Sequence, residues 1–201
     1  MKVGVMASGR GSNFQALIDA AEKGEIPDAD LIHLIVNKKD AYAIERAKKH
    51  EIDYTLITSH DKTRREFDQS VLKLLKELDI EIVVLAGFMR ILTPEFIDAY
   101  RNRILNIHPS LLPSFPGAHA HRDAIKYGVK VSGCTAHLVD EGIDSGPIIM
   151  QTSVTLSDGE TEEGLADKIL KYEHQILPKA LQLLCSGKIG VNGRYIKIKS
   201  D

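Results

Sequence analysis

The sequence predicts an α/β protein, in which a Rossmann-like, mostly parallel sheet is flanked by helices and an antiparallel strand pair lies in the C-terminal half. Short apolar runs alternate with segments of helical periodicity through the first hundred of its 201 residues. These runs are apolar on both faces, which is typical of parallel strands covered by helices on each side. Two strand candidates in the second half are separated by too few residues for a crossover helix, so we expect them to pair antiparallel.

Five strands are expected in the first half, joined by right-handed helical crossovers. They cover residues 2–6, 31–36, 53–57, 82–86 and 104–107. Between them, apolar spacings of three and four residues predict a helix that starts near Phe14, a short helix over 41–50, and a helix with its apolar face over 67–78.

Two patterns predict where helices begin. Ser12 is followed three residues later by Gln15, which is the pattern of a capping box with Ser12 as the N-cap. Thr93 is followed by Pro94, a proline suited to the first helical position, and this pair predicts a helix toward Tyr100.

In the second half, strands are expected over 131–139 and 148–154. A last helix carries apolar residues from Leu165 to Leu184 and is stopped by Gly187. The tail is basic and short, and we expect at most one edge strand there. We interpret residues 1–201 as a single domain, with halves over 1–100 and 101–187 and a tail over 188–201.

Composition excludes several classes of protein. The chain is 43% hydrophobic and 27% charged, which is ordinary globular composition. Its 26 basic and 28 acidic residues give a net charge of 26 − 28 = −2, so nothing predicts a nucleic-acid partner. The cysteines, Cys134 and Cys185, are too few and too far apart to predict a disulfide scaffold or a zinc site. No apolar stretch suggests a membrane span or a signal peptide, and we expect a cytoplasmic protein without membrane partners.

A glycine-rich loop joins the first strand to the first helix. Residues 7–13 read Ala-Ser-Gly-Arg-Gly-Ser-Asn, so glycines allow close backbone approach just where the helix presents unpaired N–H groups. This pattern favours an anion site, although a plain strand-to-helix turn is the alternative. A dinucleotide oxidoreductase is disfavoured, because Phe14 interrupts the Gly-x-Gly-x-x-Gly pattern.

Asn106 and His108 stand at the carboxyl end of the fifth strand, where open α/β sheets place their ligands. Positions i and i+2 of a strand share a face, so the amide and the imidazole point the same way. An amide can donate to an oxyanion and a histidine can move protons, and this combination suits acyl transfer. A structural His-Pro turn is the alternative interpretation.

An acidic loop over 140–147 joins the two strands of the second half and contains Asp144. A carboxylate that approaches His108 would favour its charged form and fix its orientation. Calcium is disfavoured, because the loop lacks the EF-hand pattern. His119, His121 and His137 are further candidates, but without partners at ligand spacing we interpret them as cavity-wall or helix-cap residues and expect no metal site.

Four motifs occur in one order and together resemble the phosphoribosylglycinamide formyltransferases, a folate-dependent enzyme family of purine biosynthesis. They are Gly-Arg-Gly-Ser-Asn at 9–13, Leu-Ala-Gly-Phe-Met-Arg-Ile-Leu at 85–92, Asn-Ile-His-Pro-Ser-Leu-Leu-Pro at 106–113, and the acidic loop. The resemblance extends from Lys2 to the last helix. It implies a formyltransferase fold, in which 1–100 is the nucleotide-binding half and 101–187 the folate-binding and catalytic half.

The resemblance also implies roles for individual residues. The catalytic set would be Asn106, His108 and Asp144. The residues that bind the ribonucleotide would be Gly11, Ser12, Asn13 and Glu173. The residues that bind the folate would be Arg64, Met89, Arg90, Ile91, Leu92, Asn106, Val139 and Asp140, where Arg64 could be exchanged with its neighbour Arg65.

The activity implied is transfer of the formyl group of 10-formyltetrahydrofolate, as co-substrate, to the amine of glycinamide ribonucleotide, without a metal and by a monomer or homodimer. A transfer-RNA formyltransferase would be expected to carry a further C-terminal domain, and a formyltetrahydrofolate hydrolase an N-terminal regulatory domain. A nucleotide-binding module without turnover is the alternative from another class, and Asn106, His108 and Asp144 argue against it.

Overall fold

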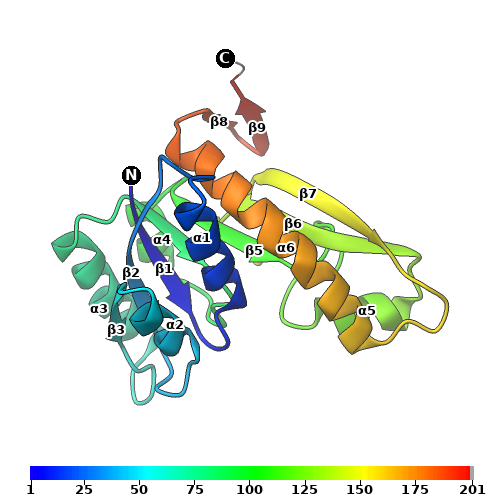
Figure 1. The fold of residues 1–201 in the computed structure, drawn as a ribbon, viewed down its shortest axis with the longest axis horizontal. Coiled ribbons are helices and arrows are strands. Elements are labelled where there is room, and N and C mark those ends of the chain that lie inside the picture. The colour runs from blue at the N-terminus through cyan, green and yellow to red at the C-terminus, as the bar shows by residue number, and fades with distance from the viewer. Residues whose placement is uncertain (200–201) are drawn as a thin grey trace.

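The computed structural model describes residues 1–199, and most of its strands form one seven-stranded sheet (Figure 1). The strands of this sheet are β1 (Lys2–Ala7), β2 (Asp30–Val36), β3 (Asp53–Leu56), β4 (Ile82–Leu85), β5 (Ile104–His108), β6 (Val131–Leu138) and β7 (Ile148–Thr155). The helices are α1 (Ser12–Glu22), α2 (Ala43–Lys49), α3 (Arg64–Glu77), α4 (Pro94–Ala99), α5 (Ala120–Tyr127) and α6 (Glu162–Cys185). Every strand predicted for this sheet is present, with ends that differ by at most one residue.

The strand order is β3-β2-β1-β4-β5-β6-β7. Strands β1 to β5 pair in parallel, which is the order of a Rossmann half, and the predicted fold class is confirmed. Strand β6 pairs antiparallel with both β5 and β7. The short acidic loop explains the β6–β7 pairing, since it leaves no length for a crossover.

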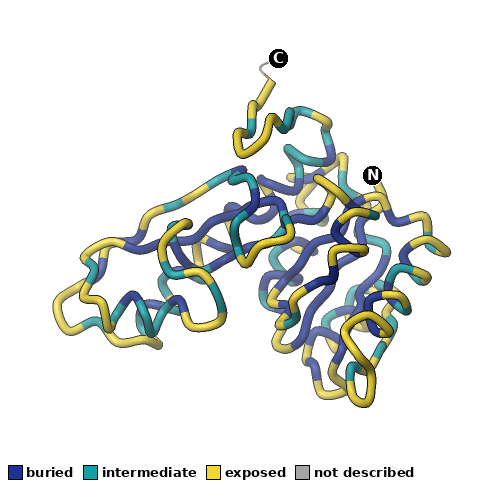
Figure 2. The backbone as a smooth tube through the Cα atoms, turned by 180° about the vertical axis from the view of Figure 1, so that it is seen from behind, coloured by how far each residue is buried: buried dark blue, intermediate teal, exposed yellow. Residues whose placement is uncertain are grey.

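Two apolar cores lie on opposite faces of this sheet, as expected for strands that are apolar on both sides. Along β1, Val3 and Val5 pack with α1 and α6, whereas Met6 packs with α3 and α4. Strand β4 alternates in the same way, with Val84 on the first face and Val83 on the second. The buried strands run through the centre of the molecule in Figure 2, with exposed chain around them.

The first helix begins differently from the prediction. Gly11, in a left-handed conformation with φ of 67°, is the N-cap of α1, so Ser12 is already helical and the capping box is absent. The cause is close packing, because a Cβ at Gly11 would lie 2.7 Å from the Cβ of Ala43. The start at Thr93 is confirmed: its side chain accepts a hydrogen bond from the N–H of Phe96, and Pro94 follows at the first helical position.

Two parts of the structure differ from the prediction made from the sequence. Helix α5 was not expected, although its apolar face has buried Ala120 and Ala124 four residues apart and Gly128 ends it in a left-handed conformation. The tail contains two strands, β8 (Ile189–Asn192) and β9 (Tyr195–Ile198), which pair with each other in a separate sheet. The expectation of one edge strand is therefore wrong, because Gly193 at the turn lets the segment fold back on itself.

Within residues 1–199, no helix combines the length and the apolar character that a membrane crossing requires.

Candidate active site

Two cavities open at the carboxyl ends of β1, β4 and β5. The larger, which we call the glycine-loop cavity, has a volume of about 410 Å³ and lies between the loop after β1 and helix α6. The smaller, the acidic-loop cavity, has a volume of about 110 Å³ and lies between the loop after β4 and the loop over 140–145. Ile107 lines the first and Asn106 lines the second, so the end of β5 separates the two cavities.

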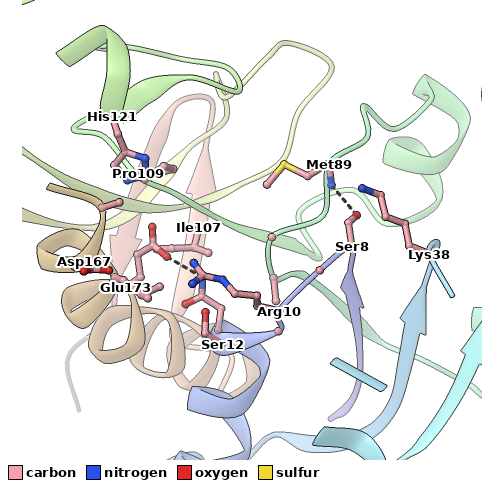
Figure 3. A pocket seen from close by; sticks show the side chains of 17 residues that line it. Ser8, Arg10, Ser12, Lys38, Met89, Ile107, Pro109, His121, Asp167 and Glu173 are labelled. Atoms are coloured by element: carbon pink, nitrogen blue, oxygen red, sulfur yellow. Dashed lines mark hydrogen bonds between the residues drawn. The ribbon is translucent and has the colours of Figure 1, made fainter. Parts of the chain in front are cut away.

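The glycine-loop cavity contains the residues predicted to bind an anion. Gly11, Ser12 and Asn13 line it at the start of α1, where the first N–H groups of the helix have no partner within the helix. Arg10 and Lys38 line the same cavity (Figure 3). Helix dipole, free N–H groups and two cations together favour a phosphate-sized anion.

Gly11 gives a testable prediction about this loop. We expect Gly11→Ala to lower the free energy of unfolding by about 2 kcal/mol, because the alanine adopts a left-handed conformation and its Cβ overlaps Ala43. Melting curves should show a fall of roughly 4–8 °C. Gly9→Ala is the matched control: its Cβ has no atom within 4 Å, so that variant should melt like the parent chain. Equal midpoints for the two variants would contradict this account.

Glu173 reaches this cavity from α6 and is buried. The Nδ2 of Asn13 donates a hydrogen bond of 2.8 Å to its Oε2 (Figure 3). Burial raises the pKa of Glu173, and the hydrogen bond from Asn13 opposes that shift. The Oδ1 of Asn13 is buried and has no hydrogen-bond partner among residues 1–199, so it is an acceptor that a ligand hydroxyl can use.

The raised pKa of Glu173 predicts how stability depends on pH. The unfolded chain loses this proton at lower pH than the folded chain, so stability falls as pH rises from the ordinary glutamate pKa toward the folded one. We expect Glu173→Gln to melt like the parent chain near pH 4 and at a higher temperature than the parent chain at pH 8. Glu163→Gln, exposed on the same helix, should show no such trend. Parallel melting curves for Glu173→Gln and the parent chain at all pH values would refute the account.

Asn106, His108 and Asp144 converge at the end of β5, although Asp144 comes from a distant loop. The Nδ1 of His108 lies 3.3 Å from Oδ2 of Asp144, and the Nδ2 of Asn106 lies 3.5 Å from Oδ1 of the same carboxylate. Asp144 itself has φ of 49° and accepts a 2.7 Å hydrogen bond from the N–H of Gly117. The three side chains therefore share one polar cluster, as the sequence analysis expected.

The protonation of His108 follows from its two contacts. Its Nε2 lies 2.9 Å from the carbonyl oxygen of Phe115, and its Nδ1 faces the carboxylate of Asp144. Both partners are acceptors, so the arrangement is fully satisfied only when both ring nitrogens carry hydrogen. In that state His108 is a cation in a buried position, paired with an anion.

His137 is a member of this cluster whose role the sequence analysis did not predict. It lies opposite Asn106 in the register of β5 and β6. Burial lowers its pKa, outweighing the nearby Leu138 carbonyl and Asp144. The neutral ring donates from Nδ1 to the carbonyl of Leu138 and accepts at Nε2 from the Nδ2 of Asn106, at 3.1 Å. His137 thereby orients the side-chain amide of Asn106. The one signal that could have indicated this contact is the pairing register of β5 and β6, which places the two residues opposite each other.

The acidic-loop cavity collects most of the residues predicted to bind folate. Arg90, Ile91, Leu92, Val139 and Asp140 line it beside Asn106 and Asp144, and its remaining wall includes apolar side chains such as Leu85, Phe88 and Ile97. Such a lining suits a flat, partly apolar ligand with polar edges.

Two residues predicted to bind folate lie elsewhere. Met89 lines the glycine-loop cavity and is 71% exposed. Arg64 is exposed on the first turn of α3 and lines neither cavity, while Arg65 is 3.5 Å from Glu95.

Contacts from helix α3 fix the loop that follows β4. Asp68 of α3 is buried, and its Oδ2 accepts a 2.6 Å hydrogen bond from the N–H of Thr93. The guanidinium of Arg90 stacks over the ring of Phe67, with 4.7 Å between its central carbon and the ring centroid.

In the part of the chain that the structure describes, no group of three His, Cys, Asp or Glu side chains is arranged to hold a metal ion.

Fold and site together define a class: a Rossmann-like α/β protein with a helix N-terminus suited to an anion after β1 and a His–Asp–Asn cluster suited to acyl transfer after β5. Residues 1–181 match the family model described as formyl transferase. The chain belongs to the formyl transferase family.

The chain is also similar to named members of this family. The phosphoribosylglycinamide formyltransferase of Escherichia coli is 39% identical over 193 residues, covering 94% of this chain and 89% of that protein. A trifunctional purine biosynthetic protein, adenosine-3 of Homo sapiens, is 42% identical over 204 residues, covering all of this chain and 20% of that protein. The chain spans a fifth or less of the trifunctional relatives it matches. The crystal structure of glycinamide ribonucleotide transformylase 1 from Symbiobacterium toebii aligns with a TM-score of 0.97 and 41% identity, over 100% of this chain and 94% of that one.

Proposed function

We propose that this chain transfers the formyl group of 10-formyltetrahydrofolate to the amine of 5-phosphoribosylglycinamide, in the cytoplasm and as a step of purine biosynthesis. The products are formylglycinamide ribonucleotide and tetrahydrofolate. The observation that carries the proposal is that Asn106 and Asp144, which contact each other and His108, line the acidic-loop cavity at the end of β5, while the neighbouring Ile107 lines the glycine-loop cavity. One cavity has the features of an anion site and the other suits a flat heterocycle, so two substrates can meet at the end of β5.

The proposed arrangement assigns each substrate to one cavity. The ribonucleotide phosphate binds at Gly11, Ser12 and Asn13, with Glu173 near its sugar hydroxyls. The folate lies in the acidic-loop cavity against residues 90–92, Val139 and Asp140, while Met89 lines the other cavity. Arg64 lies outside that cavity, so its contact with folate stays a prediction of the sequence resemblance.

The proposed chemistry is acyl transfer through a tetrahedral intermediate. The neutral amine attacks the formyl carbon with its lone pair, and the carbonyl π electrons move to oxygen. Asn106 donates to that oxygen, and the His108 cation, held by Asp144, stabilises its charge. The C–N bond to the folate then breaks as the folate nitrogen takes a proton from the His108 cation, and the attacking nitrogen returns one of its protons to the same ring nitrogen. The new formamide keeps one hydrogen on nitrogen, so atoms balance.

An absorbance assay tests the proposal. The full chain is incubated with both substrates, and formation of tetrahydrofolate is followed together with mass detection of formylglycinamide ribonucleotide. We expect product from the complete mixture and little folate turnover when the ribonucleotide is omitted. Equal turnover without ribonucleotide would identify a formyltetrahydrofolate hydrolase instead. Absence of folate turnover in both mixtures, with binding retained, would favour a nucleotide-binding module.

A further inference from the structure

The proposed reaction needs a base for the attacking amine. An amine next to a carbonyl-bearing carbon has a pKa of about 8, so most of it is protonated at neutral pH and has no free lone pair. His108 is poorly placed to accept its proton, because its two ring nitrogens already face the Phe115 carbonyl and the Asp144 carboxylate. His137 is engaged as well, because its Nε2 lies 3.1 Å from the Nδ2 of Asn106. A further base beside the amine would raise the neutral fraction above what solvent alone provides.

His121 presents a lone pair to the cavity that would hold the amine. It lines the glycine-loop cavity together with Pro109, across the cavity from Ser12 in the view of Figure 3. Its Nε2 is buried and has no hydrogen-bond partner within residues 1–199. A buried imidazole nitrogen without a partner carries a desolvation cost that a ligand N–H can remove.

His121 lies beside Pro109, on the opposite side of the cavity from Ser12 (Figure 3). If the phosphate binds at Gly11 to Asn13, the other end of the ligand would extend toward Ile107 and Pro109. His121 stands at that end, on the first turn of α5. The substrate amine and the formyl carbon have to meet there, because Asn106 lies just across β5 in the other cavity.

The charges around His121 keep it neutral. Burial lowers its pKa, and the cation of His108 on β5 acts in the same direction, while Glu162 of α6 opposes them. The carboxylates of Asp167 and Glu173 line the same cavity from α6. Glu173 is engaged by Asn13, and carboxylates are in general weaker bases than an imidazole for a proton that leaves an amine near pH 7.

We propose that Nε2 of His121 binds the substrate amine and accepts its first proton, which makes the lone pair available for attack on the formyl carbon. This inference rests on the proposed function. The proton leaves the ammonium nitrogen, its bonding electrons remain there as the lone pair, and imidazolium forms at His121. That proton passes to solvent after the product departs, so His121 takes the first proton and His108 handles the second. His121 is thus a catalytic residue on the amine side of the reaction.

Steady-state kinetics of the full chain between pH 6.5 and 9.5 test this role. At saturating formyl donor, we expect His121→Gln to lower kcat/KM for the ribonucleotide about tenfold at pH 7, because only about a tenth of an amine with a pKa of about 8 is neutral there. The deficit should shrink to about twofold or less by pH 9, where the amine is largely deprotonated without help. Lys126→Gln, exposed on the same helix, is the matched control and should follow the parent profile.

A second variant keeps the test independent of folding. His121→Ala leaves space for a small base, and added imidazole should restore most of the roughly tenfold loss at pH 7. A deficit below threefold at pH 7, a deficit that stays constant across the pH range, or an equal loss in Asp167→Asn would overturn the inference. An inactive parent chain would instead overturn the proposed function, so the two failures are distinguishable.

Discussion

Asp144→Asn is expected to lower kcat for formyl transfer by about 10³-fold or more, with KM for both substrates changed only a few-fold. The carboxylate has contacts on both oxygens, with His108 and Gly117 at Oδ2 and with Asn106 at Oδ1. An amide can accept at only one of these atoms and would place N–H groups against a donor at the other. The buried His108 cation would also lose its counter-charge, and a buried charge without a partner is strongly unfavourable.

Glu141→Gln is the matched control for this variant. Glu141 belongs to the same loop, but its side chain is 61% exposed and lies 3.4 Å from Arg101. Glu141 also lines the acidic-loop cavity, so its loss can change KM for the folate, but its charge is paired with Arg101 and not with His108, and turnover at saturating substrates should change by less than about threefold. Initial rates with both substrates saturating give kcat for the two variants. If Asp144→Asn retained a tenth or more of the parent kcat, Asp144 would have no essential part in the chemistry.

The strands were predictable from the sequence because their apolar runs are long enough to leave one interpretation. Residues 82–86 have no polar position, and such a run fits only a strand covered on both faces. Helix α5 was missed for the opposite reason. It has eight residues and no side-chain cap, and its buried face consists mainly of the small residues Ala120 and Ala124. That face gives little hydrophobic periodicity to detect.

The start of α1 shows how tertiary packing overrides a local pattern. Ser12 and Gln15 have the spacing of a capping box, yet Gln15 instead accepts a hydrogen bond from Arg46 and donates one to Asp19. Close approach of Ala43 places Gly11 in the left-handed conformation and starts the helix one residue early. As a result, Ser12 is the first helical residue of α1, and it lines the glycine-loop cavity.

In the candidate site, the side chains could be predicted but their partners could not. Asn106 and His108 were found from alternation along one strand, and Asp144 from the acidity of its loop. The groups that fix them are the Phe115 carbonyl and the Gly117 N–H, which are backbone groups and leave no signature in the sequence. The catalytic and binding roles themselves stay predictions.

Asn106→Ala is expected to lower kcat by about 10²–10³-fold, the usual loss on removing one oxyanion donor. One hydrogen of the amide is used by His137, and the other points toward Asp144 at the long distance of 3.5 Å. The long contact is the one that a developing oxyanion can replace, so this donor gains most of its strength in the transition state. Alanine fits β5 without altering its pairing, and the loss should therefore appear in kcat and not in the melting midpoint.

A variant of His137 tests the same role of Asn106, because His137 is expected to affect kcat only by orienting the Asn106 amide. His137→Phe removes the acceptor that orients the amide, and we expect a smaller loss in kcat, about tenfold. The double variant should be no worse than Asn106→Ala alone, since the orienting contact has no purpose once the amide is gone. Rates of the four chains at saturating substrates give this cycle directly. Multiplying losses would show that His137 acts independently of Asn106, and an Asn106→Ala chain within about threefold of the parent would remove the oxyanion role from that amide.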